Sequence, residues 1–167
     1  MRSFEETARP PDAFGYEHEV WFPPSGEQSG QVIKATYGNC FGHLPDGSEA
    51  TPLGYLERLR LCNEVLGDQI RLLGVDEFRP GVIRVITSQP AIEGHPAESE
   101  EVVQFFTGSG FEKRRWGANT VWFRPVDNLV ASDTHGGNVL RTASGALVAI
   151  DVPLMIWHPG MKPLDAV

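Results

Sequence analysis

The chain has 167 residues, of which 41% are hydrophobic and 10% aromatic, a composition typical of a globular protein with its own core. A formal net charge of −8 disfavours general binding to nucleic acid, because an acidic surface repels phosphate backbones. The sequence contains neither an apolar run of membrane-spanning length nor a secretory segment, so we expect a cytoplasmic protein that binds no membrane.

The front of the chain predicts a small sheet. Residues 1–13 are polar and indicate a loose lead-in before it. Residues 19–22 and 31–36 are rich in apolar and β-branched side chains, and we expect a strand and its return strand there. A Pro- and Gly-rich loop at 23–30 separates the two.

A helix is predicted to follow this strand pair. Thr51 is a good capping residue, and Pro52 suits the first helical position because it has no backbone N–H to leave unpaired. The helix is expected to run to about Leu66 and to end at Gly67, a residue that readily adopts the left-handed conformation.

The middle of the chain predicts two more strands, at 70–73 and 82–87, joined by a turn at 79–81. A second helix is expected at 96–106, ended by Gly108. The predicted order is strands, helix, strands, helix, strands. This order suits an α+β domain with a small sheet lobe and a second lobe. Further short strands are predicted at 111–115, 120–124 and 128–131.

Three oxygen-bearing side chains follow. Asp133 and Asn138 flank a short Gly-containing loop, and Asp151 ends an apolar run. Between the last two, apolar segments surround a turn signal at 143–145, which predicts a β-hairpin that brings Asn138 and Asp151 side by side. Carboxylate and amide oxygens are the protein ligands that Mg²⁺ prefers, with phosphates completing its shell. The pattern therefore favours a magnesium-nucleotide site.

Other interpretations of these residues stay open. Asp133 could cap a turn through backbone amides, and Asn138 could be a turn residue at a strand entrance. A zinc site from Asp133, His135 and Asp151 is a further alternative, although short His-x-x-His motifs are absent. The basic run at 113–115 is either a solvated edge or a phosphate contact.

The Asp-x-His-x-Gly-Asn loop at 133–138, with an Ile-Asp pair thirteen residues after the Asn, resembles the protein-kinase-like superfamily. It is closer to the aminoglycoside phosphotransferase and choline kinase branch than to ordinary protein kinases. Within the superfamily, the chain resembles the small kinase-like domains of polyvalent proteins of phages and mobile elements, over roughly residues 14 to 155. Supporting features are Gly15-x-Glu17, Val32-Ile33-Lys34, the helix at 55–59 and the segment 87–90.

The resemblance implies a role for each rear residue. Asp133 would be the catalytic base that orients an acceptor hydroxyl. Asn138 would belong to the catalytic loop, offering its amide oxygen to Mg²⁺ and its NH₂ group to the Asp133 carboxylate. Asp151 would be the second metal ligand. His135 would brace the loop, and Gly136-Gly137 would allow a tight or positive-φ path.

The resemblance also implies nucleotide-binding residues in the front half. Lys34 would neutralise phosphate, and its acidic partner on the first helix would be Glu57, with Glu64 as the alternate. Ser88 and Gln89 resemble a hinge that offers backbone groups to adenine, although a turn at a strand end explains them nearly as well.

Two departures from kinases are visible. A Gly-x-Gly-x-x-Gly motif does not precede Lys34, and little chain follows Asp151. We therefore expect a minimal two-lobe protein-kinase-like fold with a small antiparallel sheet lobe, about 14–90, and a strongly reduced C-terminal lobe, about 91–167. The alternative to a reduced lobe is one that a partner chain completes.

The expected function is a Mg-ATP-dependent phosphotransferase acting on an unknown acceptor, protein or small molecule. One alternative is a catalytically inactive module, with a kinase-like fold, that binds nucleotide or another protein. A metal-dependent hydrolase using the same acids is a third. Turnover of ATP separates the first from the other two.

Overall fold

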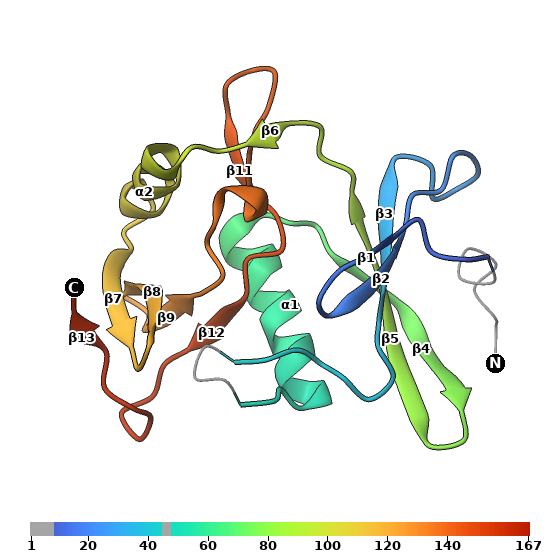
Figure 1. Ribbon diagram of the computed structural model, residues 1–167, viewed down its shortest axis with the longest axis horizontal. Helices are drawn as coiled ribbons and strands as arrows, with labels where there is room; N and C mark the ends of the chain where they lie inside the picture. The colour runs from blue at the N-terminus through green and yellow to red at the C-terminus, as the bar shows by residue number, and fades with distance from the viewer. Residues whose placement is uncertain (1–8, 45–47) are drawn as a thin grey trace. The chain divides into compact units, whose positions relative to one another are not determined.

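The structure is a computed structural model that describes residues 9–44 and 48–167. It is an α+β fold in which more of the described residues lie in strands than in helices (Figure 1). The chain divides into two compact units. Unit 1 comprises the described residues of Met1–Gly42, with Glu49–Tyr55 and Asp68–Ala91, and unit 2 comprises those of His43–Ser48, with Leu56–Gly67 and Ile92–Val167. No helix in the described ranges is both long and apolar enough to cross a membrane.

Unit 1 is built on one antiparallel sheet of five strands (Figure 1). All neighbouring strands pair antiparallel, and one of the pairs is interrupted by two shifts in register. In spatial order the strands are β1 (Ala13–Phe14), β2 (His18–Trp21), β3 (Gln31–Thr36), β5 (Val82–Pro90) and β4 (Arg71–Arg79).

The two faces of this sheet differ in polarity. Ile33 and Ala35 lie on one face and pack with Trp21 and Ile86 in a buried apolar cluster. Because side chains alternate along a strand, Lys34 lies on the other face. The unit 1 core is therefore asymmetric, with an apolar face and a face that carries a buried lysine.

The strands predicted from the sequence are present. β3 has the predicted limits, and β2 is shifted by one residue. The predicted pair 70–73 and 82–87 forms a longer hairpin, β4–β5, whose turn contains Gly81 at φ 76°. Residues 9–13, predicted as part of a lead-in, are bonded to the sheet: Asp12 N–H donates to Val20 O, and Trp21 Nε1 donates to Arg9 O. Residues 1–8 of that segment lie outside the described chain.

The charged side chain of Arg84 is buried beside the apolar cluster of unit 1. Arg84 is 9% exposed at its side chain and binds Glu19 Oε2 at 3.0 Å and Asp76 Oδ2 at 2.7 Å. Its guanidinium also lies 4.6 Å from the centre of the Phe78 ring. Arg84 thus neutralises carboxylates from β2 and β4 at the same time.

We expect Arg84→Met to destabilise the protein by about 2 kcal/mol, because it leaves two partly buried carboxylates without a cation. The shift in the urea unfolding midpoint measures this. The control is Arg60→Met on the exposed side of the first helix, which should shift the midpoint much less. Equal midpoints for Arg84→Met and wild type would show that the ion pairs contribute nothing to folding.

Helix α1 (Pro52–Leu66) has the predicted limits. Thr51 Oγ1 accepts the Gly54 N–H at 3.0 Å, so the predicted N-cap is confirmed, and Gly67 follows the helix at φ 75°. Tyr55, in its first turn, is buried and shares a hydrogen bond of 2.9 Å with His18 of β2.

Unit 2 contains a second antiparallel sheet of five strands, with helix α2 (Ser99–Gly108) against one face (Figure 1). Phe106 of α2 stacks on Trp122 with ring centroids 5.3 Å apart. On the other face, Trp157 and Met161 of the tail pack on Trp116 and its neighbours. The strands, in spatial order, are β12 (Leu154–Ile156), β9 (Leu129–Ala131), β8 (Asn119–Arg124), β7 (Glu112–Trp116) and β13 (Asp165–Ala166).

The second helix begins later than the sequence predicted. Residues His95–Pro96 form strand β6, which pairs with Leu140 and Arg141 later in the chain. The helix therefore does not begin at Pro96. Glu98 precedes the first turn instead, and its N–H donates to Glu101 Oε2 at 2.8 Å. That contact is half of a capping box, which fixes the start of α2 at Ser99.

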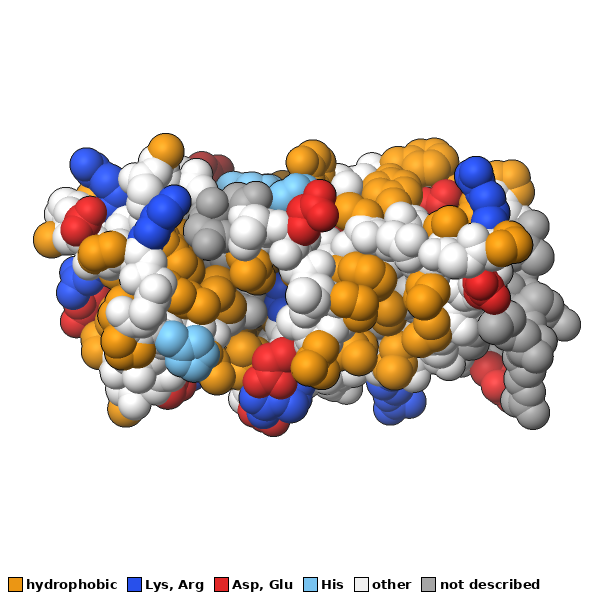
Figure 2. Space-filling view, turned by 90° about the horizontal axis from the view of Figure 1, so that it is seen from below, with side chains coloured by type: hydrophobic (Ala, Val, Ile, Leu, Met, Phe, Trp, Pro, Cys, Tyr) orange, Lys and Arg blue, Asp and Glu red, His pale blue; other side chains and the backbone are white. Residues whose placement is uncertain are grey.

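Among the described residues on the face shown in Figure 2, Lys and Arg side chains do not form one continuous patch. On the face shown in Figure 2, Lys and Arg side chains are separated from one another and interspersed with acidic ones. Several arginines are paired with an acid close in sequence, including Arg114 of the predicted basic run, which binds Glu112. These pairs lower the local positive potential that a phosphate backbone would need.

Candidate active site

The predicted catalytic loop connects β9 with β10 (Val139–Arg141) and contains one turn of 3₁₀ helix, η2 (Gly136–Asn138). The Asn138 side chain closes it. Asn138 Nδ2 donates to the Asp133 backbone oxygen at 2.8 Å and to Asp133 Oδ2 at 3.1 Å. The contact expected between the amide NH₂ group and the carboxylate is therefore present. Since Nδ2 faces Asp133, the amide oxygen of Asn138 is directed away from that carboxylate.

The predicted hairpin is confirmed. Strand β10 pairs with β11 (Leu147–Ala149), and Gly145 turns between them at φ 83°. The pairing continues to the open end, where Ile150 N–H donates to Asn138 O at 2.8 Å. This bond fixes Asn138 beside Ile150, the residue that precedes Asp151, although Asp151 comes thirteen positions after Asn138 in the sequence. The hairpin thus brings the two predicted metal ligands to the same end of a ladder.

Helix α1 helps to hold the chain after Asp151. Val152 is 1% exposed, and its carbonyl accepts the Cys62 thiol at 3.3 Å. This end of the hairpin is therefore anchored in the core of unit 2. Burial of Val152 fixes the backbone from which the Asp151 carboxylate projects.

Both predicted acids have an unusual backbone. Asp133 has φ 51° and Asp151 has φ 52°, in the left-handed region where side chains other than Gly, Asn and Asp are rare. Such residues concentrate at active sites, where the surrounding structure fixes a conformation that the isolated chain would avoid. Here the fixing contacts are those of Asn138 and Val152.

The two glycines of the loop are needed for close approach and not for positive φ, which corrects one of the two expected explanations. A Cβ atom on Gly136 would lie 2.2 Å from the backbone oxygen of Ala97, and one on Gly137 would lie 2.8 Å from Cε1 of His135. Gly136 O also accepts the Ala97 N–H at 3.2 Å. The loop therefore lies directly against the segment that leads into α2.

His135 makes two contacts inside the loop. Its Nδ1 accepts the Gly137 N–H at 3.0 Å, and its Nε2 lies 3.4 Å from Asp133 Oδ1. The zinc alternative, with Asp133, His135 and Asp151 as ligands, gains no support: among the described residues, no three His, Cys, Asp or Glu side chains gather as a metal-binding group.

Sequence reasoning missed the tie between α2 and the hairpin. Glu101 uses one oxygen to cap the helix and the other, Oε1, to accept Arg141 Nη1 at 2.9 Å. The Glu98-x-x-Glu101 spacing is a capping signal that could have placed the helix start. The partner on β10 leaves no local signal, because the two residues are forty positions apart.

Lys34 belongs to unit 1. It lies in the central strand β3, opposite Val20 on one side and Thr87 on the other, and is only 7% exposed. Gln89 shares this face, since it is two residues from Thr87 along β5. The lysine therefore lies among buried polar groups and not in the apolar cluster of the opposite face. An ammonium group is expensive to bury unless hydrogen bonds or an anion compensate it.

Ser88 and Gln89 lie within β5, which runs three residues beyond the predicted strand. Ser88 pairs with Ile33 on one side and Arg71 on the other, whereas Gln89 pairs with Val32 and lies past the end of β4. The segment is therefore a strand end and not a separate turn. Backbone groups on the β4 side of the sheet lose their strand partner beyond Ser88.

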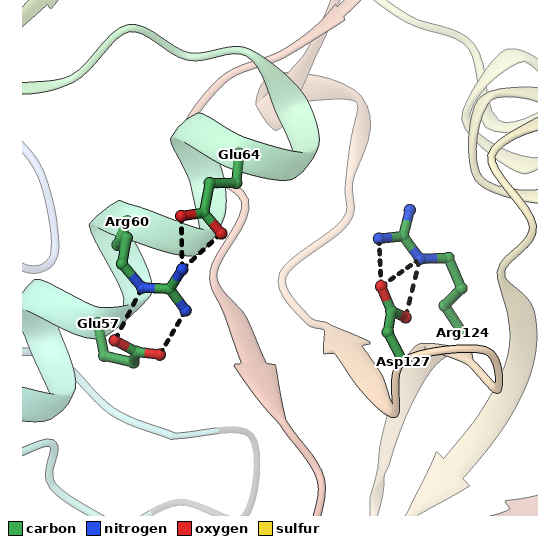
Figure 3. A network of polar contacts seen from close by, with 5 residues as sticks. All are labelled: Glu57, Arg60, Glu64, Arg124 and Asp127. Atoms are coloured by element: carbon green, nitrogen blue, oxygen red, sulfur yellow. Dashed lines mark hydrogen bonds and ion pairs between the residues drawn. The ribbon is translucent and has the colours of Figure 1, made fainter.

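Both candidate acids of α1 bind a neighbour on the helix. Arg60 lies between Glu57 and Glu64 and forms ion pairs with each, at 2.7 Å and 2.5 Å (Figure 3). The hydrogen bond from Arg60 lowers the pKa of Glu57. Pairing of Lys34 with either acid stays a prediction, and it requires that acid to exchange Arg60 for the lysine.

A second arginine of unit 2, Arg124, also binds a nearby carboxylate, that of Asp127, at 2.7 Å (Figure 3). Hydrogen bonds from Arg124 lower the pKa of Asp127. This pair lies in the β8–β9 turn and is structural.

Comparison with known proteins identifies the family. Residues 13–157, most of the chain, match the family Kinase-PolyVal, described as the serine/threonine/tyrosine kinase found in polyvalent proteins. No curated protein and no solved structure matches the chain. The family match includes the Asp133 loop and the hairpin ending at Asp151, so the resemblance inferred from those residues is confirmed. The chain therefore belongs to the kinase family found in polyvalent proteins and is a kinase-like phosphotransferase domain.

Proposed function

We propose that this domain transfers the γ-phosphoryl group of Mg-ATP to a hydroxyl acceptor, with Asp133 as the base. One observation carries the proposal. Asn138 donates its amide NH₂ to the Asp133 carboxylate while its backbone carbonyl accepts the Ile150 N–H, so one residue joins the expected base to the expected metal ligand Asp151.

The donor set fits magnesium. The Asn138 amide oxygen and the Asp151 carboxylate are hard oxygen ligands, and two protein ligands suffice where phosphates and water complete the shell. A bound Mg²⁺ would neutralise charge on the phosphates. The protein's own contribution is to hold these two oxygens at one end of a hairpin before the nucleotide arrives.

Asp133 supports general-base chemistry. Each carboxylate oxygen has two lone pairs, and the hydrogen bond from Asn138 uses one of those on Oδ2. The remaining lone pairs can accept the proton of an acceptor hydroxyl while its oxygen forms the new bond to phosphorus. The bond from the γ-phosphorus to the bridging oxygen breaks, and ADP leaves with the electron pair.

The front half supplies the nucleotide contacts in this proposal. Lys34 neutralises phosphate charge, and its burial on a polar face supports that role. The strand end at Ser88 and Gln89 offers backbone groups to the adenine ring, which is supported by the loss of a β4 partner beyond Ser88. Glu57 is the proposed partner of Lys34 once Arg60 releases it.

The test is transfer of label from γ-labelled ATP, with Mg²⁺, to the chain itself, to added protein acceptors or to small hydroxyl compounds. We expect Mg²⁺-dependent transfer by the wild type. A thermal shift with Mg-ATP and no transfer to any acceptor would contradict the proposal and favour the inactive nucleotide-binding module. Product release from other substrates without ATP would favour a hydrolase.

For Lys34→Met we expect kcat/KM for ATP to fall by about 10- to 100-fold, the loss of one charge-assisted hydrogen bond to phosphate. Initial rates at varied ATP measure it, with a melting curve to confirm folding. Lys113→Met is the matched control, because Lys113 is exposed on β7. A loss in Lys113→Met and none in Lys34→Met would move the phosphate contact to the basic run.

A further inference from the structure

The C-terminal tail, residues 157–167, crosses one face of the unit 2 sheet from edge to edge. It follows strand β12 at one edge of the sheet, and its own strand β13 lies at the opposite edge, beyond β7. Between the two, Met161 and Leu164 pack on the apolar cluster around Trp116. Most residues of the tail are nevertheless exposed, so the tail is a thin cover over an apolar surface.

The tail leaves a buried donor without an acceptor. Trp116 is 1% exposed, and its Nε1–H group meets no hydrogen-bond acceptor among the described residues. Asp165 pairs with Arg115 and Ala166 with Arg114, and the same register, continued by one residue, places Leu164 opposite Trp116. A leucine side chain has no atom that can accept the indole proton. The closed tail is weakened, because a buried donor without a partner has lost its hydrogen bond to water.

The edge of β7 is also used incompletely. β13 pairs with two of the five residues of β7, Arg114 and Arg115. Asp165 lies opposite Arg115, on the face of the sheet away from Trp116. Within the described ranges no ion pair joins these two side chains. The tail therefore has a strand, an apolar residue and an acid in suitable places, but it leaves both the indole N–H and the guanidinium unmatched.

We propose that the tail-covered face and the edge of β7 form a docking surface for an extended peptide of another protein, and that the tail occupies this surface in the absence of that peptide. Such a peptide adds a strand to β7. Its backbone then supplies hydrogen bonds, and its alternate side chains reach the two faces of the sheet. The two unmatched groups define its chemistry: a side-chain oxygen opposite Trp116, followed by a carboxylate opposite Arg115.

Competition between the tail and the peptide follows from one missing contact. The tail keeps its place because it belongs to the same chain, which gives it an effective concentration in the mM range. A free peptide of the tail sequence makes the same contacts and displaces the tail only at a comparable concentration. A peptide that also accepts the Trp116 N–H should bind about 5- to 100-fold more tightly, because it removes the cost of an unpaired buried donor.

Binding of three labelled peptides to the full chain, measured by fluorescence anisotropy, tests the proposal. The first has the sequence of residues 158–167, the second carries Leu164→Gln, and the third carries both Leu164→Gln and Asp165→Lys. We expect the second to bind at least about 5-fold more tightly than the first, and the third to lose that gain. Arg115→Glu in the protein should weaken binding of the second peptide and restore binding of the third, since the charges are then exchanged.

Equal affinities of the first and second peptides would overturn the role of Trp116. A third peptide that bound wild-type protein as tightly as the second would overturn the register with Arg115. If no peptide bound at about 1 mM, the docking surface itself would be refuted, since that concentration matches the competing tail.

A measurement on the chain alone checks the same contact. In the full chain, Leu164→Gln should supply the acceptor from the tail, shift the indole N–H resonance of Trp116 and abolish binding of the second peptide. The indole of Trp157, which already donates to Lys162 O at 3.1 Å, is the internal reference and should not shift. Leu164→Ala is the matched control: it loosens the tail without an acceptor and should bind the second peptide more tightly than wild type. An unshifted Trp116 resonance in Leu164→Gln would contradict the inference.

Discussion

Asp133→Asn is expected to lower kcat for phosphoryl transfer by about 10²- to 10⁴-fold, the range typical of removing a positioned general base. The carboxamide has nearly the same shape as the carboxylate, and its oxygen can still accept the Asn138 amide N–H. It lacks the basic oxygen that takes the acceptor proton. Single-turnover transfer of label from γ-labelled ATP measures the effect without interference from product release.

Asparagine is a better test than alanine at this position. Asp133 has φ 51°, a region that Asn and Asp tolerate and Ala does not. Alanine would add backbone strain to the chemical change, and a loss of activity would then have two causes. With asparagine, the thermal midpoint should stay within a few degrees of wild type while kcat falls.

The matched control is Asp127→Asn, a carboxylate near in sequence that binds Arg124 in the β8–β9 turn. It should leave kcat unchanged. If Asp133→Asn transferred phosphate as fast as wild type, Asp133 would not be the base, and its contact with Asn138 would only close a turn.

The hairpin that carries the site could be predicted because its signals are local. An apolar run, a Gly-containing turn and a second apolar run specify a ladder by themselves, and the ladder places Asn138 beside Ile150 without any information about the rest of the chain. The same holds for α1, whose first and last turns are marked by Thr51 and Gly67.

Contacts between distant segments could not be predicted in this way. The second helix is predicted to begin at Pro96, yet His95 and Pro96 pair with β10, so strand pairing outweighs the local helix signals. For Ser88 and Gln89 the sequence leaves a hinge and a strand-end turn both open, and in the structure both residues lie in β5 and pair with β3. In both cases a neighbouring strand supplied hydrogen bonds that sequence spacing does not reveal.

The face of β3 on which Lys34 lies needed the structure as well. Alternation separates Lys34 from Ile33 but does not say which face is apolar. The answer depends on Trp21 and Ile86, which come from other strands and cover the Ile33 side.

Gly136→Ala is expected to lower kcat by about 10²-fold. The new Cβ would lie 2.2 Å from the Ala97 backbone oxygen, more than 1 Å inside ordinary contact distance, and neither backbone can rotate away as a side chain would. The loop must then shift by about 1 Å, and a misplacement of that size at a reacting group typically lowers the rate about 100-fold. Steady-state kinetics together with a melting curve separate the shift from unfolding.

Gly108→Ala is the matched control, since a Cβ at the end of α2 meets nothing within 4 Å and φ there is not positive. It should leave kcat unchanged. Wild-type kcat in Gly136→Ala would show that the loop can move without displacing the base.

Gly137→Ala then tests whether the loop acts through its backbone or through His135. Its Cβ would meet only the His135 ring, 2.8 Å from Cε1, and the ring can rotate away. The backbone should stay in place while the Nε2 contact with Asp133 is lost. We therefore expect a kcat loss of about 2- to 5-fold, far smaller than that of Gly136→Ala. The opposite order would mean that the imidazole, and not the loop backbone, sets the position of the base.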